Sequence, residues 1–175
     1  MQWLKRLSVL GLLLLPALAV PVGPALATDL QFASGIGRVR PGDAFTSFAF
    51  TSFAFTAVTQ PDGSSTGFAT FSGRLESLTV AIDCLRIGID VASGDVFVYK
   101  TFAIASGKIM DATNNMALIG KTVIFGAIDG DKTIPTPEKD TIGGDFSSDL
   151  PSYVTCENST IAVLHRVVGG DIIIY

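Results

Sequence analysis

Beyond residue 28 the chain alternates apolar and polar side chains with a period of two, as a β-strand with one buried face does. The alternation is clearest over residues 78–84 and 85–91, but the apolar positions change phase by one residue between these runs. We expect a bulge or turn near Cys84, because one extra residue resets the facing of a strand. Further segments rich in Val, Ile, Thr and aromatic residues are predicted strands, namely 96–105, 118–128, 160–168 and 171–175.

Short clusters of turn-forming residues separate these segments. Pro61-Asp62-Gly63 joins a residue preset for a turn to two that tolerate positive φ, and residues 93–95, 106–108 and 169–170 are similar glycine-containing breaks. Many short strands at this spacing predict an all-β fold. We expect an antiparallel β-sandwich, with a small β-barrel as the alternative, because strand spacing does not distinguish the two.

A tandem repeat of five residues, Thr-Ser-Phe-Ala-Phe, occupies residues 46–50 and 51–55. Because five is odd, the phenylalanines of the two copies point to opposite faces of a regular strand unless a bulge brings them into phase. We interpret the repeat as a duplicated core strand with a bulge, since aromatic residues in strands usually pack. The alternative is an aromatic stripe that binds a ligand.

The first 27 residues have the pattern of a cleaved secretory signal peptide. Lys5 and Arg6 precede an apolar run over residues 7–20, and residues 25–27 (Ala-Leu-Ala) form a small-residue cleavage site. The run is too short and too interrupted by proline for a transmembrane helix, and no lipoprotein cysteine follows it. We therefore expect a secreted or periplasmic product in which residues 28–175 form a single β-rich domain.

Both cysteines of the chain, Cys84 and Cys156, lie in the mature part. An even count in an exported protein predicts a disulfide, because thiols outside the cytoplasm tend to be oxidised. Two buried free thiols are the alternative.

The mature chain is acidic. Removing the leader, with its two basic residues, takes the formal net charge from −4 to about −6. This balance argues against nucleic acid as a partner, since a phosphate backbone attracts clustered Lys and Arg. Residues 172–175 have the apolar, aromatic-ended form of an outer-membrane strand, but strands of about ten residues with an alternating lipid face do not recur. We therefore expect no stable membrane insertion.

An acidic segment rich in Pro and Gly spans residues 129–149. Asp129, Asp131, Asp140 and Asp145 could supply the several oxygen ligands that Ca²⁺ requires, so calcium is the one candidate cofactor. Their spacing does not match an EF-hand loop. The alternative is a solvated surface loop stiffened by proline.

Catalytic motifs are weak, and we assign no catalytic residue. His165 is the only histidine and lies on an apolar alternating face, which favours packing and excludes a multi-histidine zinc site. The mature chain contains no Gly-x-Ser-x-Gly nucleophile elbow. The enzymatic alternative is a carbohydrate-active protein with paired carboxylates, such as Glu76 and Asp83 or members of the acidic segment, facing each other about 5 to 10 Å apart in a cleft.

Several short motifs follow one another along the mature chain, from a Gly-rich first strand to a Gly-x-Ile-x-Ile-like end. They lie at residues 34–37, 44–58, 61–67, 80–87, 129–131, Cys156 and 170–174. In this order they resemble those of a loose group of small exported bacterial proteins with no assigned activity. Residues 88–91 (Gly-Ile-Asp-Val) depart from the Gly-Asn-x-Ala step that often follows the Cys-Leu strand in that group. The resemblance implies an exported β-sandwich of unknown function and transfers no catalytic residue.

The signal, the strand pattern and the missing catalytic constellation favour a non-enzymatic exported β-sandwich with a binding or interaction role. We expect its partner to be a protein or a glycan at the cell envelope. The alternatives are the carboxylate enzyme and a β-barrel that holds an apolar ligand, which requires an interior cavity in place of a filled core.

Overall fold

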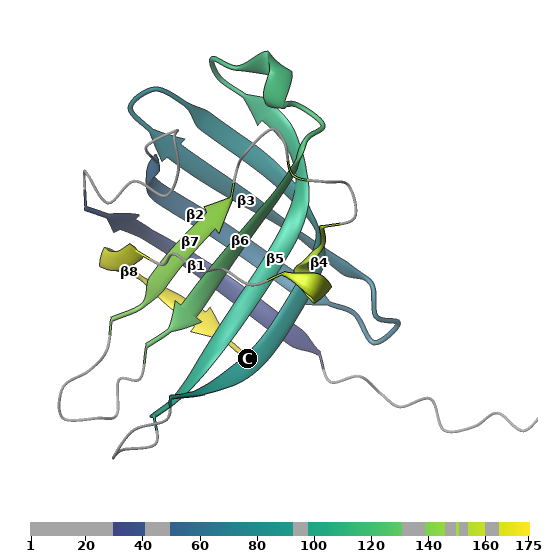
Figure 1. Cartoon of the computed structure of the whole chain (residues 1–175), viewed down its shortest axis with the longest axis vertical. Helices are drawn as coiled ribbons and strands as arrows, with labels where there is room; N and C mark the ends of the chain where they lie inside the picture. Colours follow the sequence, from purple (N-terminus) through teal and green to yellow (C-terminus); the bar gives the residue numbers. More distant parts are fainter. Residues whose placement is uncertain are drawn as a thin grey trace, which may run out of the picture.

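The structure, a computed structural model (Figure 1), describes residues 30–40, 50–92, 98–130, 139–145, 150, 154–159 and 165–175. The expected leader over residues 1–27 lies outside the described residues. The strands are β1 (Gln31–Val39), β2 (Phe50–Thr59), β3 (Ser65–Gly73), β4 (Ser77–Ala92), β5 (Val98–Ala112), β6 (Thr122–Asp129), β7 (Thr141–Asp145) and β8 (His165–Ile174). Two short 3₁₀ helices are η1 (Met116–Leu118) and η2 (Cys156–Asn158). Among these residues no helix has the length and apolar character needed to cross a membrane.

The eight strands form one antiparallel sheet that closes into a barrel, because β8 pairs with β1. Each strand also pairs with the next strand in the sequence, so the chain runs up and down around the barrel (Figure 1). The all-β prediction is confirmed, and the architecture is the barrel alternative in place of the sandwich that we expected first. Uninterrupted pairing of consecutive strands leaves no second sheet to pack on, and closure removes the two sheet edges.

The phase change near Cys84 is a β-bulge in β4, as the alternation predicts. The register of β4 against β5 shifts between Ile82 and Cys84, which leaves Asp83 as the extra residue. Val80, Ile82 and Leu85 are therefore all buried in the core, whereas Asp83 is exposed. The bulge thus preserves the apolar interior along this long strand.

The second copy of the tandem repeat forms the start of β2, together with Phe50 from the first copy. The register against β3 shifts between Phe50 and Ser52, and Phe50, Phe53 and Phe55 are all buried. The described part of the repeat, residues 50–55, is a core strand with a bulge, as the sequence indicates. Phe48 lies outside the described residues.

Aromatic rings fill the interior of the barrel. The Phe125 ring packs edge to face against Phe55 and Phe71, with ring centroids 5.4 and 5.2 Å apart. Phe71 also contacts Phe50, with centroids 5.8 Å apart. These side chains belong to one continuous core cluster that includes residues of all eight strands.

Glycines on β1 make room for two of these rings. Gly35 pairs with Phe55 across the sheet, and Gly37 pairs with Phe53. A Cβ atom on Gly35 would lie 2.6 Å from a ring carbon of Phe55, closer than van der Waals contact allows. A strand glycine here allows a large cross-strand neighbour to lie over the backbone.

Two glycine-containing breaks that we predicted as turns lie inside strands. Residues 106–108 belong to β5, and residues 169–170 belong to β8, which runs through them without interruption. A side chain on Gly107 would collide with the Ala81 carbonyl, and one on Gly170 would collide with the Ile36 carbonyl. These glycines allow close approach of neighbouring backbones, a role that the sequence does not distinguish from a turn.

The Pro61-Asp62-Gly63 segment is the predicted turn, between β2 and β3. The Gln60 N–H donates to the Ser64 carbonyl at 2.7 Å, and Gly63 adopts a positive φ of 83°. The Ser64 hydroxyl and N–H donate to the Asp62 carboxylate at 2.6 and 2.9 Å. These bonds favour the charged carboxylate and hold the pKa of Asp62 below its ordinary value.

Candidate functional site

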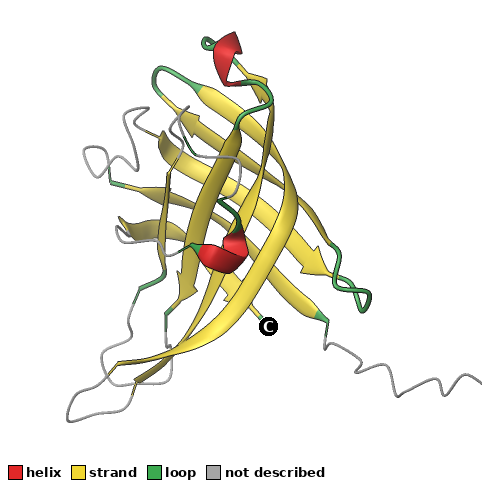
Figure 2. Cartoon of the chain, turned by 45° about the vertical axis from the view of Figure 1, so that its right-hand side comes forward, coloured by secondary structure: helices red, strands yellow, loops and turns green. Residues whose placement is uncertain are grey.

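A segment of the β7–β8 connection, residues 154–159, packs against the outer wall of the barrel and contains η2, whereas η1 lies at one end (Figure 2). Cys156 of η2 is bonded to Cys84 of β4, which confirms the predicted disulfide. The bond lies in a second apolar cluster, formed by Cys84, Phe102, Ile104, Ile124, Leu150, Val154 and Cys156. The Arg86 guanidinium also donates to the Ser159 carbonyl at 2.7 Å. Residues 154–159 are thereby held against β4, β5 and β6. Such a crosslink is typical of an oxidising compartment.

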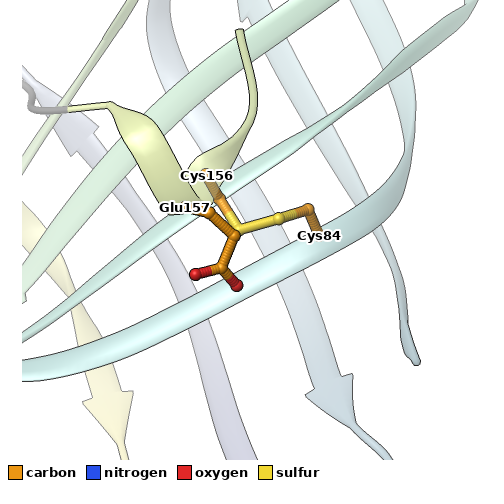
Figure 3. Close-up of side chains that lie close together, drawn as sticks. All are labelled: Cys84, Cys156 and Glu157. Carbon is orange, nitrogen blue, oxygen red and sulfur yellow. A yellow bond between two sulfur atoms is a disulfide. The ribbon is translucent and has the colours of Figure 1, made fainter. Parts of the chain in front are cut away.

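The Glu157 carboxylate lies beside this disulfide (Figure 3). Ligand atoms of Cys84, Cys156 and Glu157 lie within 4.8 Å of one another, and no other three His, Cys, Asp or Glu side chains in the described part of the chain are as compact. Cysteine binds metals as the thiolate, and two sulfur atoms bonded to each other offer none. In the oxidised protein this cluster is a crosslink.

Asp140, a candidate calcium ligand, is a buried link between three strands. Its carboxylate accepts hydrogen bonds from the N–H groups of Gly130 at 3.0 Å and Ile172 at 2.7 Å. Its backbone carbonyl accepts a third from Val167 at 2.9 Å. The pairing of β7 with β8 involves two residue pairs, the fewest of any neighbouring strands in the described part of the barrel. Asp140 therefore reinforces the weakest junction between strands. Two backbone donors satisfy its charge without a cation.

The other acidic candidates are spread along β6 and β7. Asp129 precedes Gly130 and so lies near Asp140, whereas Asp145 ends β7 and pairs with Ile124. Five residues of extended strand separate Asp140 from Asp145 by roughly 16 Å. Asp131 lies outside the described residues. Of the other three aspartates, Asp129 alone adjoins a residue that bonds to Asp140, and calcium binding stays a prediction.

Glu76 and Asp83 do not face each other across a cleft. Glu76 is buried in the β3–β4 turn, where its carboxylate accepts a hydrogen bond from the Asn114 N–H at 3.0 Å. Asp83 is the exposed bulge residue of β4, seven positions further along, so roughly 23 Å of extended chain separates the two. Glycosidases need carboxylates within about 10 Å of each other, which this pair does not offer. His165 is half-buried at the start of β8.

A groove crosses the outer face of the barrel over β8, β1, β2 and β3. It has a volume of about 650 Å³, and four adjacent strands give it a length of roughly 14 Å. Its lining includes Ile36, Arg38, Ser52, Ala54, Thr70 and Ser72, with Gly169 and Gly170 on the β8 side. Arg38 pairs with Ser52 on one strand and with Gly169 on the other, so a long side chain projects between two short ones.

Arg38 is the one charged residue in the lining of this groove. It is exposed, and its guanidinium forms no hydrogen bond or ion pair with another residue that the structure describes. The Thr70 and Ser72 side chains are exposed beside it, and the Ser52 hydroxyl donates to the Ser72 carbonyl at 3.3 Å. A guanidinium fork among hydroxyl groups is suited to carboxylates and sugar hydroxyls.

The sequence does not reveal this groove, because its residues come from four strands and none belongs to a recognisable motif. The sequence does contain small residues that face outward on β2 and β3, and the pair Gly169-Gly170 on β8. They can be recognised as one groove only once the strand register is known. Comparisons with models of protein families, with curated proteins and with solved structures found no significant match to this chain.

Proposed function

We propose that the mature protein is an exported, non-enzymatic binding protein, and that its ligand is an acidic glycan of the cell envelope held in the outer groove. The observation that carries the proposal is Arg38, an exposed guanidinium without a partner among the described residues, in a groove lined by hydroxyl groups. The disulfide and the predicted leader support export.

The shape and chemistry of the groove fit a chain of sugars. A hollow open to solvent along roughly 14 Å accommodates a polymer that continues past both ends. Arg38 provides two parallel donors for a carboxylate, and the Ser and Thr hydroxyls act as donors or acceptors toward sugar hydroxyls. Phe68, 61% exposed on the same face of β3, adds an apolar platform beside the groove.

Two features make the alternative functions less well supported. An apolar ligand inside the barrel needs a cavity. Among the residues that the structure describes, the rings of Phe55, Phe71 and Phe125 pack against one another in the interior. A carbohydrate-active enzyme needs two facing carboxylates, which Glu76 and Asp83 are too far apart to provide. The outer groove therefore remains the best-supported ligand site.

A binding titration with an oligosaccharide of uronic acids tests the proposal. Isothermal titration calorimetry of the mature protein should show binding, and Arg38→Gln should weaken it by about 10- to 150-fold, the loss of one charge-assisted hydrogen-bonded contact. Ser72→Leu should weaken binding by filling the groove.

Lys108→Gln is the matched control, because Lys108 is an exposed cation on β5, away from the groove. If Arg38→Gln and Lys108→Gln lowered the affinity equally, the binding would be nonspecific charge attraction. Absence of binding to acidic and neutral oligosaccharides alike would refute the glycan ligand.

A further inference from the structure

Three exposed arginines lie close together beside the outer groove, on β1 and β8. Arg38 lines the groove, and Arg40 follows it two residues later, roughly 7 Å along the extended chain. Val39 between them is buried and pairs with Val167 of β8. Arg40 and Arg166, the next residue on each segment, therefore begin from adjacent backbones, roughly 5 Å apart. We call Arg38, Arg40 and Arg166 the arginine cluster.

The acids at the two ends of β7 do not cancel the charge of this cluster. The Asp140 carboxylate is buried, and hydrogen bonds from two backbone N–H groups already satisfy its charge. Asp145 lies four residues beyond Thr141, which pairs with Arg166, so roughly 14 Å of extended strand separates it from the cluster. Even with Asp140 counted, positive charge remains in excess.

Other charges beside this face occur as opposite pairs. Lys139 and Asp171 both line a smaller hollow that adjoins the groove at Gly169 and Gly170. Arg74 lies in the same turn as Glu76. By contrast, the guanidinium groups of the arginine cluster form no hydrogen bond or ion pair with any residue that the structure describes. The described surface is locally positive around them, although the chain as a whole has a net charge of −4.

The use of arginine at these positions narrows the chemistry of the ligand. Beyond the leader the chain has five arginines, and the cluster holds three of them. A guanidinium presents a planar fork of donors that matches a carboxylate, whereas a lysine ammonium acts as a point charge. Three such forks within roughly 9 Å of one another match a ligand that carries several acidic groups close together.

We propose that the ligand of the groove is a polyanionic glycan, with a carboxylate on consecutive sugars, and that Arg40 and Arg166 bind it together with Arg38. The proposal rests on the glycan binding proposed above and names the class of glycan. A single acidic sugar satisfies Arg38 alone. A chain of uronic acids that leaves the groove brings further carboxylates to the other two guanidinium groups and offsets the mutual repulsion of the three cations.

Calorimetric titrations with two oligosaccharides of equal length test this proposal on the mature, disulfide-bonded protein. One is an oligogalacturonate, with a carboxylate on every sugar, and the other carries a uronic acid on every second sugar. We expect the oligogalacturonate to bind more tightly and with a steeper dependence on salt, because more charge pairs form. Arg40→Gln and Arg166→Gln should each weaken its binding about two- to fivefold, the range for one exposed ion pair, and should flatten the salt dependence.

Lys121→Gln is the matched control, because it removes an exposed cation just before β6, away from the groove. It should leave both affinities unchanged. If Arg38→Gln weakened binding while Arg40→Gln and Arg166→Gln behaved like Lys121→Gln, the polyanionic ligand would be refuted and the glycan groove would stand. Equal affinity for the two oligosaccharides would have the same meaning. Tighter binding of a DNA oligonucleotide would also overturn the proposal, and failure of both oligosaccharides to bind would refute the glycan groove itself.

Discussion

The Cys84–Cys156 disulfide should contribute a large share of the stability of the barrel. The bond joins residues 72 positions apart in the sequence. In the chain-entropy description, closing a loop of this length lowers the entropy of the unfolded chain by an amount worth about 4 kcal/mol at 25 °C. Folded single domains are commonly stable by about 5–15 kcal/mol, so this loss is a substantial fraction. We expect the free energy of unfolding of the Cys84→Ala, Cys156→Ala double variant to be about 2–5 kcal/mol lower than that of the wild type.

Urea unfolding followed by circular dichroism measures this difference. The control is wild-type protein kept reduced, which retains both sulfur atoms and loses only the bond, and its stability should fall by a similar amount. The native β-signal should survive in both, because the strands do not depend on the crosslink for pairing. A change below about 1 kcal/mol in both samples would refute the chain-entropy reasoning for this loop.

Two further substitutions test the packing and the seam of the barrel. Gly35→Ala places a methyl group against the Phe55 ring and should cost about 1–3 kcal/mol in urea unfolding, whereas Gly169→Ala, which meets no atom within 4 Å, should be close to neutral. A neutral Gly35→Ala would show that the ring moves freely. Asp140→Asn leaves one backbone N–H without an acceptor and should cost about 1–3 kcal/mol, while Asp83→Asn on the exposed bulge should not. Equal effects would contradict a structural role for Asp140.

Sequence pattern predicts the bulges and several strands of this protein, because side-chain alternation records which face is buried. It places the start of β6 too early, at residue 118, divides β8 in two, and does not predict β7 inside the acidic segment. The change of phase at Cys84 and the odd-length repeat both correspond to register shifts, next to Asp83 and before Ser52. Pairing of the two cysteines follows from their even number and the expected export. These features depend on local spacing or on simple counting, both of which are present in the chain itself.

Other features depend on which strands become neighbours, and local spacing does not contain that information. Sandwich and barrel share the same alternation and differ in whether β8 pairs with β1. Gly107 and Gly170 look like turn residues, yet each permits close contact with a strand distant in sequence. The groove likewise assembles from four separate strands, so it has no sequence motif.

The most direct test of the account asks where a ligand binds. Amide shifts in ¹⁵N-labelled mature protein, titrated with a uronic acid oligosaccharide, report contact residue by residue. The account predicts shifts at Arg38, Ser52 and Ser72 on the outer face, with the interior Phe125 unaffected. Shifts centred on Phe125 and its neighbouring rings would place the ligand inside the barrel and contradict the account.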